Sequence, residues 1–109
     1  MTIIHNLGFP RIGAQRELKH ALEAFWKGDT PESTLIQQAK ALRQRHWLAQ
    51  KAAGLDLIPV GDFAYYDHVL QTLLWLGALP SRFGIDPAQA TLSDQFGLAR
   101  GTPSQPALE

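Results

Sequence analysis

The sequence contains no cysteine, which excludes disulfide bonds, thiol nucleophiles and thiolate-bound zinc from its 109 residues. It has no excess of either charge, because ten Lys and Arg balance ten Asp and Glu. No global field would therefore hold it on nucleic acid or on an anionic membrane, and any electrostatic binding must be local. It also lacks a signal peptide and a long apolar run, since Leu73–Leu79 is far too short to span a membrane. We expect a soluble, cytoplasmic protein.

What the sequence does contain is a succession of strand and helix signals. Residues 2–7 (TIIHNL) are rich in β-branched side chains and predict a strand, which the loop 8–13 (GFPRIG) ends. A first helix is predicted from about Ala14 to a stop at Gly28. Its apolar face comprises Leu18, Ala21, Leu22 and Phe25.

A long second helix is predicted after Thr30, whose side chain can cap it, with Pro31 at its first position. Its apolar stripe steps by three and four residues and stops before Gly54. The stripe comprises Leu35, Ala39, Leu42, His46, Ala49 and Ala53. The charged residues Lys40 and Arg45 fall off this stripe.

The second half of the chain predicts a strand, a buried helix and a tail. Residues 55–62 (LDLIPVGD) are more continuously apolar than alternating, as in a parallel strand covered on both faces. Residues 66–79 are apolar almost all round, so a helix there is expected to be buried rather than amphipathic. Residues 80–109 predict a loop or extended tail, with a short helix near residues 91–98. We therefore expect packed βα units over 1–79 and a tail over 80–109.

The order strand, helix, helix, strand, helix is typical of an α/β fold whose two strands are parallel. Two parallel strands cannot form a buried sheet alone, so the chain has the pattern of a part of something larger. The loops after the two strands, 8–13 and 61–68, would emerge at the same edge of the sheet, where α/β proteins place their chemistry.

Three cations surround the predicted start of the first helix: Arg11, Arg16 and Lys19. Each costs a few tenths of a kcal/mol to about 1 kcal/mol there, because a helix N-terminus carries a partial positive charge. A bound carboxylate or phosphate would reverse the sign of that effect. The alternative is a solvated helix face, with Lys19 pairing to Glu23 one turn later.

The remaining polar and aromatic candidates favour structural roles. Asp62, Asp67 and His68 would diverge on a helix, which argues against a metal site, and Asp62 is most simply the cap of the third helix. His46 lies on the apolar stripe, which favours a packed core histidine over a ligand. We assign no chemical role to His5, His20, Trp26, Trp47 or Trp75.

Three segments in register resemble one known family. They are LGFPRIGAQRELKHALEAFW (7–26), LRQRHW (42–47) and LIPVGDFAYYDHVL (57–70). In residue identity, order and spacing they resemble the N-terminal region of cobalamin-independent methionine synthase. The resemblance extends over the whole chain and implies the first strand-helix-helix-strand-helix units of an N-terminal (β/α)8 barrel, helix-rich and incomplete as an isolated chain.

The resemblance also implies a function. The family enzyme transfers a methyl group from 5-methyltetrahydrofolate with a glutamate tail to homocysteine, giving methionine, and uses a zinc ion. The zinc ligands lie in the second barrel of the family enzyme, so this chain is expected to hold no metal and no catalytic residue. The family's motif for the methylfolate polyglutamate matches Arg16, Glu17, Leu18 and Lys19.

Two hypotheses follow from the resemblance. In the first, the chain is an N-terminal fragment of this methyltransferase, inactive alone, whose partners are the folate substrate and the remainder of the two-barrel enzyme. In the second, it is a stand-alone, non-catalytic module that binds folate or associates with itself through open sheet edges. A helical anion-binding domain unrelated to the enzyme would explain the basic helix start but not the three motifs.

Overall fold

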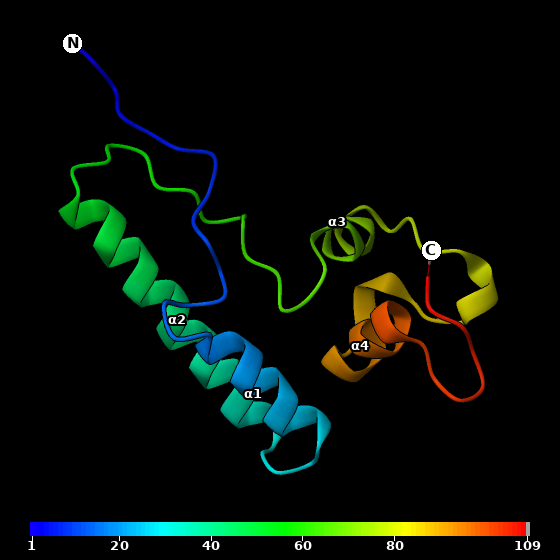
Figure 1. Ribbon diagram of the computed structural model, residues 1–109. Helices are drawn as coiled ribbons and strands as arrows, with labels where there is room; N and C mark the ends of the chain where they lie inside the picture. The colour runs from blue at the N-terminus through cyan, green and yellow to red at the C-terminus, as the bar shows by residue number, and fades with distance from the viewer. Residues whose placement is uncertain (109) are drawn as a thin grey trace. The chain divides into compact units, whose positions relative to one another are not determined.

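The computed structural model describes residues 1–108 of the chain as a helical protein (Figure 1). It divides into two compact units, Met1–Tyr65 and Tyr66–Glu109. The α-helices are α1 (Glu17–Trp26), α2 (Glu32–Ala52), α3 (His68–Leu76) and α4 (Leu92–Arg100). Two 3-10 turns, η1 (Ser81–Phe83) and η2 (Pro87–Gln89), lie between α3 and α4 along the chain.

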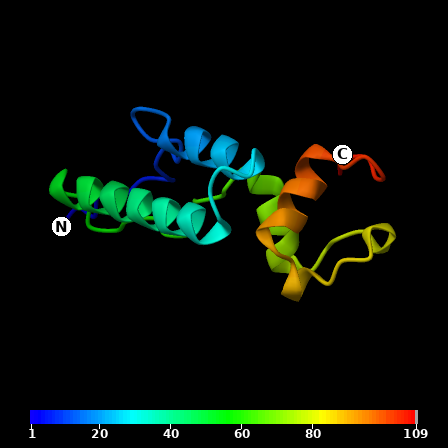
Figure 2. The same ribbon diagram turned by 90° about the horizontal axis from the view of Figure 1, so that it is seen from below.

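In the first unit, α1 and α2 lie side by side as a helical hairpin, as both Figure 1 and Figure 2 show. Six residues of the predicted apolar stripes are buried, and Phe25 and His46 are partly buried. The six are Leu18, Ala21, Leu22, Leu35, Ala39 and Leu42. The far end of the stripe does not follow the prediction, because Ala49 and Ala53 are exposed. The core of this unit is therefore concentrated at the first half of α2.

The prediction of an α/β fold with two parallel strands was wrong. Among residues 1–108 no strand forms, and the segments 2–7 and 55–62 meet in a single parallel bridge between His5 and Leu57. One bridge leaves most backbone N–H and C=O groups of both segments without a ladder partner. Two isolated strands are at best marginally stable in water, so an extended pair without further strands to flank it does not become a sheet.

A few backbone and side-chain hydrogen bonds, rather than a ladder, join the N-terminal segment to the segment after α2. The backbone N–H of Ile4 donates to the Asp56 carboxylate at 2.8 Å, and the N–H of Asp56 donates to the Ile4 carbonyl at 2.8 Å. Further along, the N–H of Phe9 donates to Asp62 Oδ2 at 2.8 Å. The two loops that were expected to meet at a sheet edge are thus in contact, although no sheet brings them together.

The ends of two helices differ from the predictions. Pro31, not Thr30, occupies the position before α2 and provides no side-chain cap. The Thr30 hydroxyl is buried without a hydrogen-bond partner among the described residues. Asp67, not Asp62, caps α3, because its carboxylate accepts from the N–H groups of Val69 and Leu70.

In the second unit, α3 packs against α4 and the η2 turn over a small core. The buried residues of that core are Leu70, Leu74, Phe83 and Leu98. The prediction that the third helix is buried all round was wrong, because Val69, Trp75 and Leu76 are exposed. A short helix near residues 91–98 is confirmed as α4, whose first turn is closed by a capping box between Thr91 and Asp94.

None of the helices formed by residues 1–108 combines the length and apolar character needed to cross a membrane.

Candidate functional site

The start of α1 has an unusual backbone conformation at Arg16. This residue has φ 59° and ψ 35°, a left-handed conformation that no other non-glycine residue among 1–108 adopts. For a residue with a Cβ, that conformation costs roughly 1–2 kcal/mol. It persists because two backbone hydrogen bonds close the turn: Arg16 N–H to the Gly13 carbonyl and Leu18 N–H to the Ile12 carbonyl, both at 3.0 Å.

The carboxylate of Glu17, the first residue of α1, interacts with the backbone of this turn. One carboxylate oxygen, Oε1, accepts from the N–H of Gln15 at 2.6 Å, and the other, Oε2, is paired with the guanidinium of Arg45 on α2. The hydrogen bond from Arg45, followed by that from Gln15, lowers the pKa of the Glu17 carboxyl below its ordinary value. Glu17 is therefore held in its ionised form at the helix N-terminus, whose partial positive charge favours an acidic side chain.

Gly13 makes room for that carboxylate. A Cβ at this position would lie 2.7 Å from Glu17 Oε2, and the φ of +90° is one that side chains rarely adopt. Glycine is thus required here both by backbone conformation and by contact.

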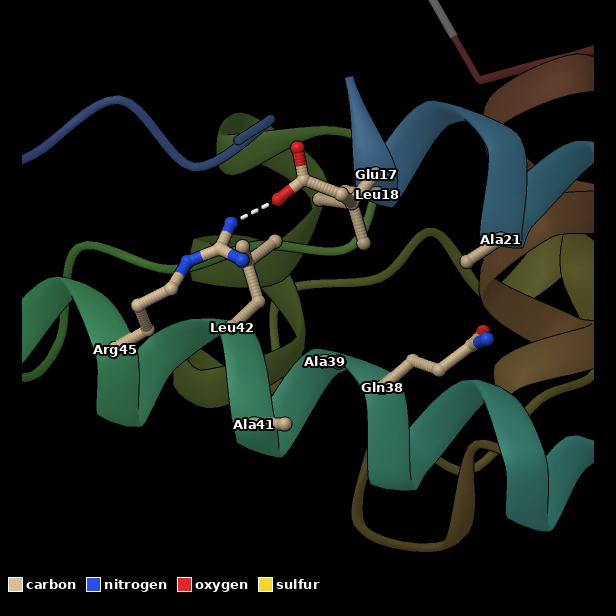
Figure 3. A pocket seen from close by; sticks show the side chains of 8 residues that line it. All are labelled: Glu17, Leu18, Ala21, Gln38, Ala39, Ala41, Leu42 and Arg45. Carbon is tan, nitrogen blue, oxygen red and sulfur yellow. Dashed lines mark hydrogen bonds and ion pairs between the residues drawn. The ribbon is translucent and has the colours of Figure 1, made fainter. Parts of the chain in front are cut away.

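The Glu17–Arg45 pair borders two surface pockets of the first unit. One, of about 390 Å³, has an apolar floor formed by Leu18, Ala39 and Leu42 between α1 and α2 (Figure 3). The other, of about 600 Å³, is lined by the turn before α1 and by Arg45 and His46 of α2. In Figure 3 the two charged side chains reach toward each other from the facing helices, above the floor of the first pocket.

The four predicted site residues lie in sequence at this turn but differ in surroundings. Arg16 and Lys19 are exposed and line neither of the two pockets, whereas Leu18 is 1% exposed and belongs to the core. The pairing of Lys19 with Glu23, which belongs to the alternative of a solvated helix face, is present, with 3.9 Å between the Nζ and Oε1 atoms. Arg16 makes no ion pair among the described residues, and its side chain is exposed.

His46 lines the larger pocket and stacks on Phe9, with 4.6 Å between the ring centroids. Burial, reinforced by the nearby charge of Arg45, lowers the pKa of the His46 imidazole below its ordinary value. The packed role predicted for this histidine is consistent with that environment, since a neutral ring stacks at lower desolvation cost than a charged one.

Two acidic residues after α2 have structural roles. Asp62 and Asp67 accept backbone hydrogen bonds in different places, from Phe9 and from the first turn of α3. Among residues 1–108 no group of three or more His, Asp or Glu side chains is placed to hold a metal ion. The donors of these described residues therefore do not fit a zinc site.

Sequence reasoning missed Arg45 as a part of the site. Its partner Glu17 lies 28 residues earlier, so no local periodicity could reveal the contact. The one available signal was an arginine just beside the apolar stripe of α2. That position is equally typical of a solvated helix face with no role in a site.

Comparison with known proteins places these features in a family. The family model for the cobalamin-independent synthase, N-terminal domain, matches residues 3–109. A protein of Ralstonia pickettii (strain 12J) named 5-methyltetrahydropteroyltriglutamate--homocysteine methyltransferase is 61% identical over 109 residues, which are all of this chain and 14% of that protein. Proteins of the same name from Burkholderia thailandensis and Nitrosomonas europaea are each 55% identical, over 100% and 99% of this chain and 15% and 14% of theirs.

The chain thus spans about 14 to 15% of the length of these relatives. The match covers almost every residue, including the turn before α1 and the segment that carries Arg45. This chain belongs to the cobalamin-independent methionine synthase family, within the region of its N-terminal domain.

Proposed function

We propose that this chain is the N-terminal part of an enzyme that transfers a methyl group from 5-methyltetrahydrofolate polyglutamate to homocysteine, and that it contributes to binding the glutamate tail. The names of its relatives support the proposal, since they specify a triglutamyl folate and homocysteine as the two substrates of those proteins. On its own the chain is expected to be inactive, with its partners being the folate substrate and the rest of the enzyme.

The observation that carries the proposal is the exposed Arg16, held in a strained conformation at the start of α1 beside Lys19. A cation such as Arg16 at the positive end of a helix is unfavourable unless an anion binds there, whereas Lys19 already pairs with Glu23. A tail of carboxylates is such an anion, and a guanidinium can bind a carboxylate through two parallel hydrogen bonds.

The four residues would contribute in different ways. Arg16 and Lys19 would contact the carboxylates of the tail directly. Leu18 would anchor the turn through its buried side chain, and Glu17 would orient the turn through Gln15 and Arg45. A direct contact of Glu17 with the tail is disfavoured because both are anionic.

Any zinc ion of the whole enzyme would be bound elsewhere, because this chain has no cysteine and its described residues form no metal-binding cluster. The part of the enzyme that it supplies is therefore proposed to bind substrate, not to perform the chemistry of methyl transfer.

The proposal is tested with the double variant Arg16→Ala/Lys19→Ala of the full-length enzyme. A charge-assisted hydrogen bond contributes about 1.5–3 kcal/mol, so we expect the dissociation constant of the triglutamyl substrate to rise about 10- to 100-fold. The monoglutamyl form should change much less, and the zinc content should stay the same. Calorimetric titration and metal analysis give these quantities.

The matched control is Lys27→Ala, which removes an exposed lysine at the other end of α1. It should leave both dissociation constants unchanged. Equal losses for the triglutamyl and monoglutamyl forms, or a parallel loss of zinc, would refute the proposed tail contact.

A second candidate function is a non-catalytic module that binds folate or associates with itself. The observation in its favour is the single parallel bridge between segments whose apolar side chains are exposed, including Ile3, Ile4 and Val60. Sequencing the gene beyond the codon for Glu109 separates the two candidates. An open frame that continues at the length of the relatives supports the enzyme, and a stop codon supports the module.

A further inference from the structure

The turn that contains Arg16 is connected to another helix through the Glu17 carboxylate. Glu17 Oε1 accepts a hydrogen bond from the N–H of Gln15, and Glu17 Oε2 accepts one from the guanidinium of Arg45 on α2. Gly13 fits against the same carboxylate, with no space for a Cβ. Gly13 and Gln15, on the N-terminal side of Arg16, therefore contact one carboxylate, and that carboxylate is paired with α2.

This turn contains one unfavourable backbone conformation, which its two internal backbone hydrogen bonds help to hold. Arg16 has the only left-handed backbone of a non-glycine residue among 1–108, and its side chain provides no cap for α1. Neither local sequence preference nor a capping bond from Arg16 favours the observed shape. The contact from Arg45 to Glu17 adds a constraint from another helix to the two backbone hydrogen bonds that close the turn.

Stability alone does not account for the Glu17–Arg45 pair. Both side chains are accessible to water, with exposed fractions of 34% for Glu17 and 58% for Arg45, and exposed ion pairs contribute little to folding. The apolar contacts of Leu18, Ala21 and Leu22 already pack α1 against α2. What the pair adds is a fixed orientation at one end of the interface.

We propose that Arg45 is a positioning residue for folate-tail binding: it fixes Glu17, which fixes the Gly13–Gln15 turn and so directs Arg16 toward the carboxylates of the tail. This inference rests on the proposed function of Arg16 and Lys19. Arg45 acts through Glu17 and does not itself bind the tail.

The first test is the Arg45→Ala variant of the full-length enzyme, assayed with the triglutamyl substrate. Loss of the constraint should raise KM about 3- to 10-fold and change kcat less than twofold, since the chemistry lies outside this chain. Arg45→Lys restores a cation of similar reach and should recover part of the loss. Lys40→Ala, which removes an exposed cation from the same helix, should leave KM unchanged.

The second test distinguishes positioning from direct binding. Glu17→Gln weakens the link to Arg45 but keeps an oxygen that can accept from the N–H of Gln15. If Arg45 acts through Glu17, the double variant Glu17→Gln/Arg45→Ala will bind the triglutamyl substrate no more weakly than Arg45→Ala alone. Additive losses would show that Arg45 contacts the tail itself and would overturn the inference.

The outcomes also separate this inference from the function on which it rests. If Arg16→Ala/Lys19→Ala weakens tail binding and Arg45→Ala does not, the proposed function stands and the positioning role is wrong. If Arg16→Ala/Lys19→Ala has no effect on tail binding, the proposed function fails and the positioning role fails with it. Circular dichroism of each variant, compared with Arg45→Lys, identifies any loss of folding.

Discussion

At the scale of single residues, the start of α1 is held by a side chain inside the helix rather than by a cap before it. Arg16 occupies the cap position but makes no capping bond, and Glu17 reaches back to the N–H of Gln15. The lowered pKa of Glu17 implies that its favourable contribution to folding is present above the ordinary value of 4.5. That contribution is lost as the pH falls through the lower pKa of the folded state.

His46 gives a pH dependence in a different range. Because its folded-state pKa is lowered, the unfolded chain binds more protons as the pH falls below the ordinary value of 6.5, and stability decreases in that direction. We therefore expect the free energy of unfolding to fall between about pH 7.5 and about pH 5.5. Urea denaturation at the two pH values measures this change.

The control for His46 is His46→Phe, which keeps an aromatic ring beside Phe9 and cannot titrate. The decrease on acidification should be smaller in the variant than in the natural chain. An identical decrease in both would mean that His46 does not contribute to the pH dependence.

At the scale of elements, α1 lies between two glycines with positive φ, and glycine is required at each position for a different reason. Gly13 precedes the helix at φ +90° and faces the Glu17 carboxylate, whereas Gly28 follows it at φ +80° with open space around it. The first glycine is required by conformation and by contact, and the second by conformation alone.

This difference predicts unequal effects of the same substitution. Gly28→Ala should destabilise the chain by about 1 kcal/mol, through backbone strain alone. Gly13→Ala should cost about 2–3 kcal/mol, because the new methyl group also displaces the Glu17 carboxylate. Urea denaturation of both variants provides the comparison, and equal losses would contradict the role assigned to the carboxylate.

At the scale of the whole molecule, exposed apolar side chains distinguish this chain from a self-contained domain. Ile3 and Leu57, on the two segments joined by the single parallel bridge, are 60% and 59% exposed. Trp75 and Leu76 are exposed on α3 in the other unit. Large apolar side chains exposed in each unit are surfaces that other protein can cover.

We expect the isolated 109-residue chain to self-associate as its concentration rises, because open extended segments pair readily with other chains. Sedimentation velocity over a range of concentrations should show a growing share of dimer or larger species. Ile3→Lys should reduce that share, while Lys51→Ala, at an exposed position on α2, should not. A chain that stays monomeric at every concentration would contradict this expectation and the self-associating form of the module.

The helices were largely predictable because their signals are local. The periodicity of apolar residues located α1 and α2 and the residues that pack them, and the motifs around Arg16 and after α2 identified the family. Local signals were less reliable for helix ends. Asp67 rather than Asp62 precedes α3, and Pro31 rather than Thr30 precedes α2. Any of these polar or proline residues can begin a helix, so their order alone does not decide.

The sequence by itself determined the family, through three motifs in register along the chain. It also determined the two helices and the cluster of basic residues at the start of α1, because these depend on neighbours within a few positions. Only the tertiary structure decided that residues 2–7 and 55–62 do not form a sheet, since strand pairing depends on further strands to flank the pair. Only the tertiary structure joined Glu17 to Arg45 across 28 residues, because a contact between helices depends on how they pack.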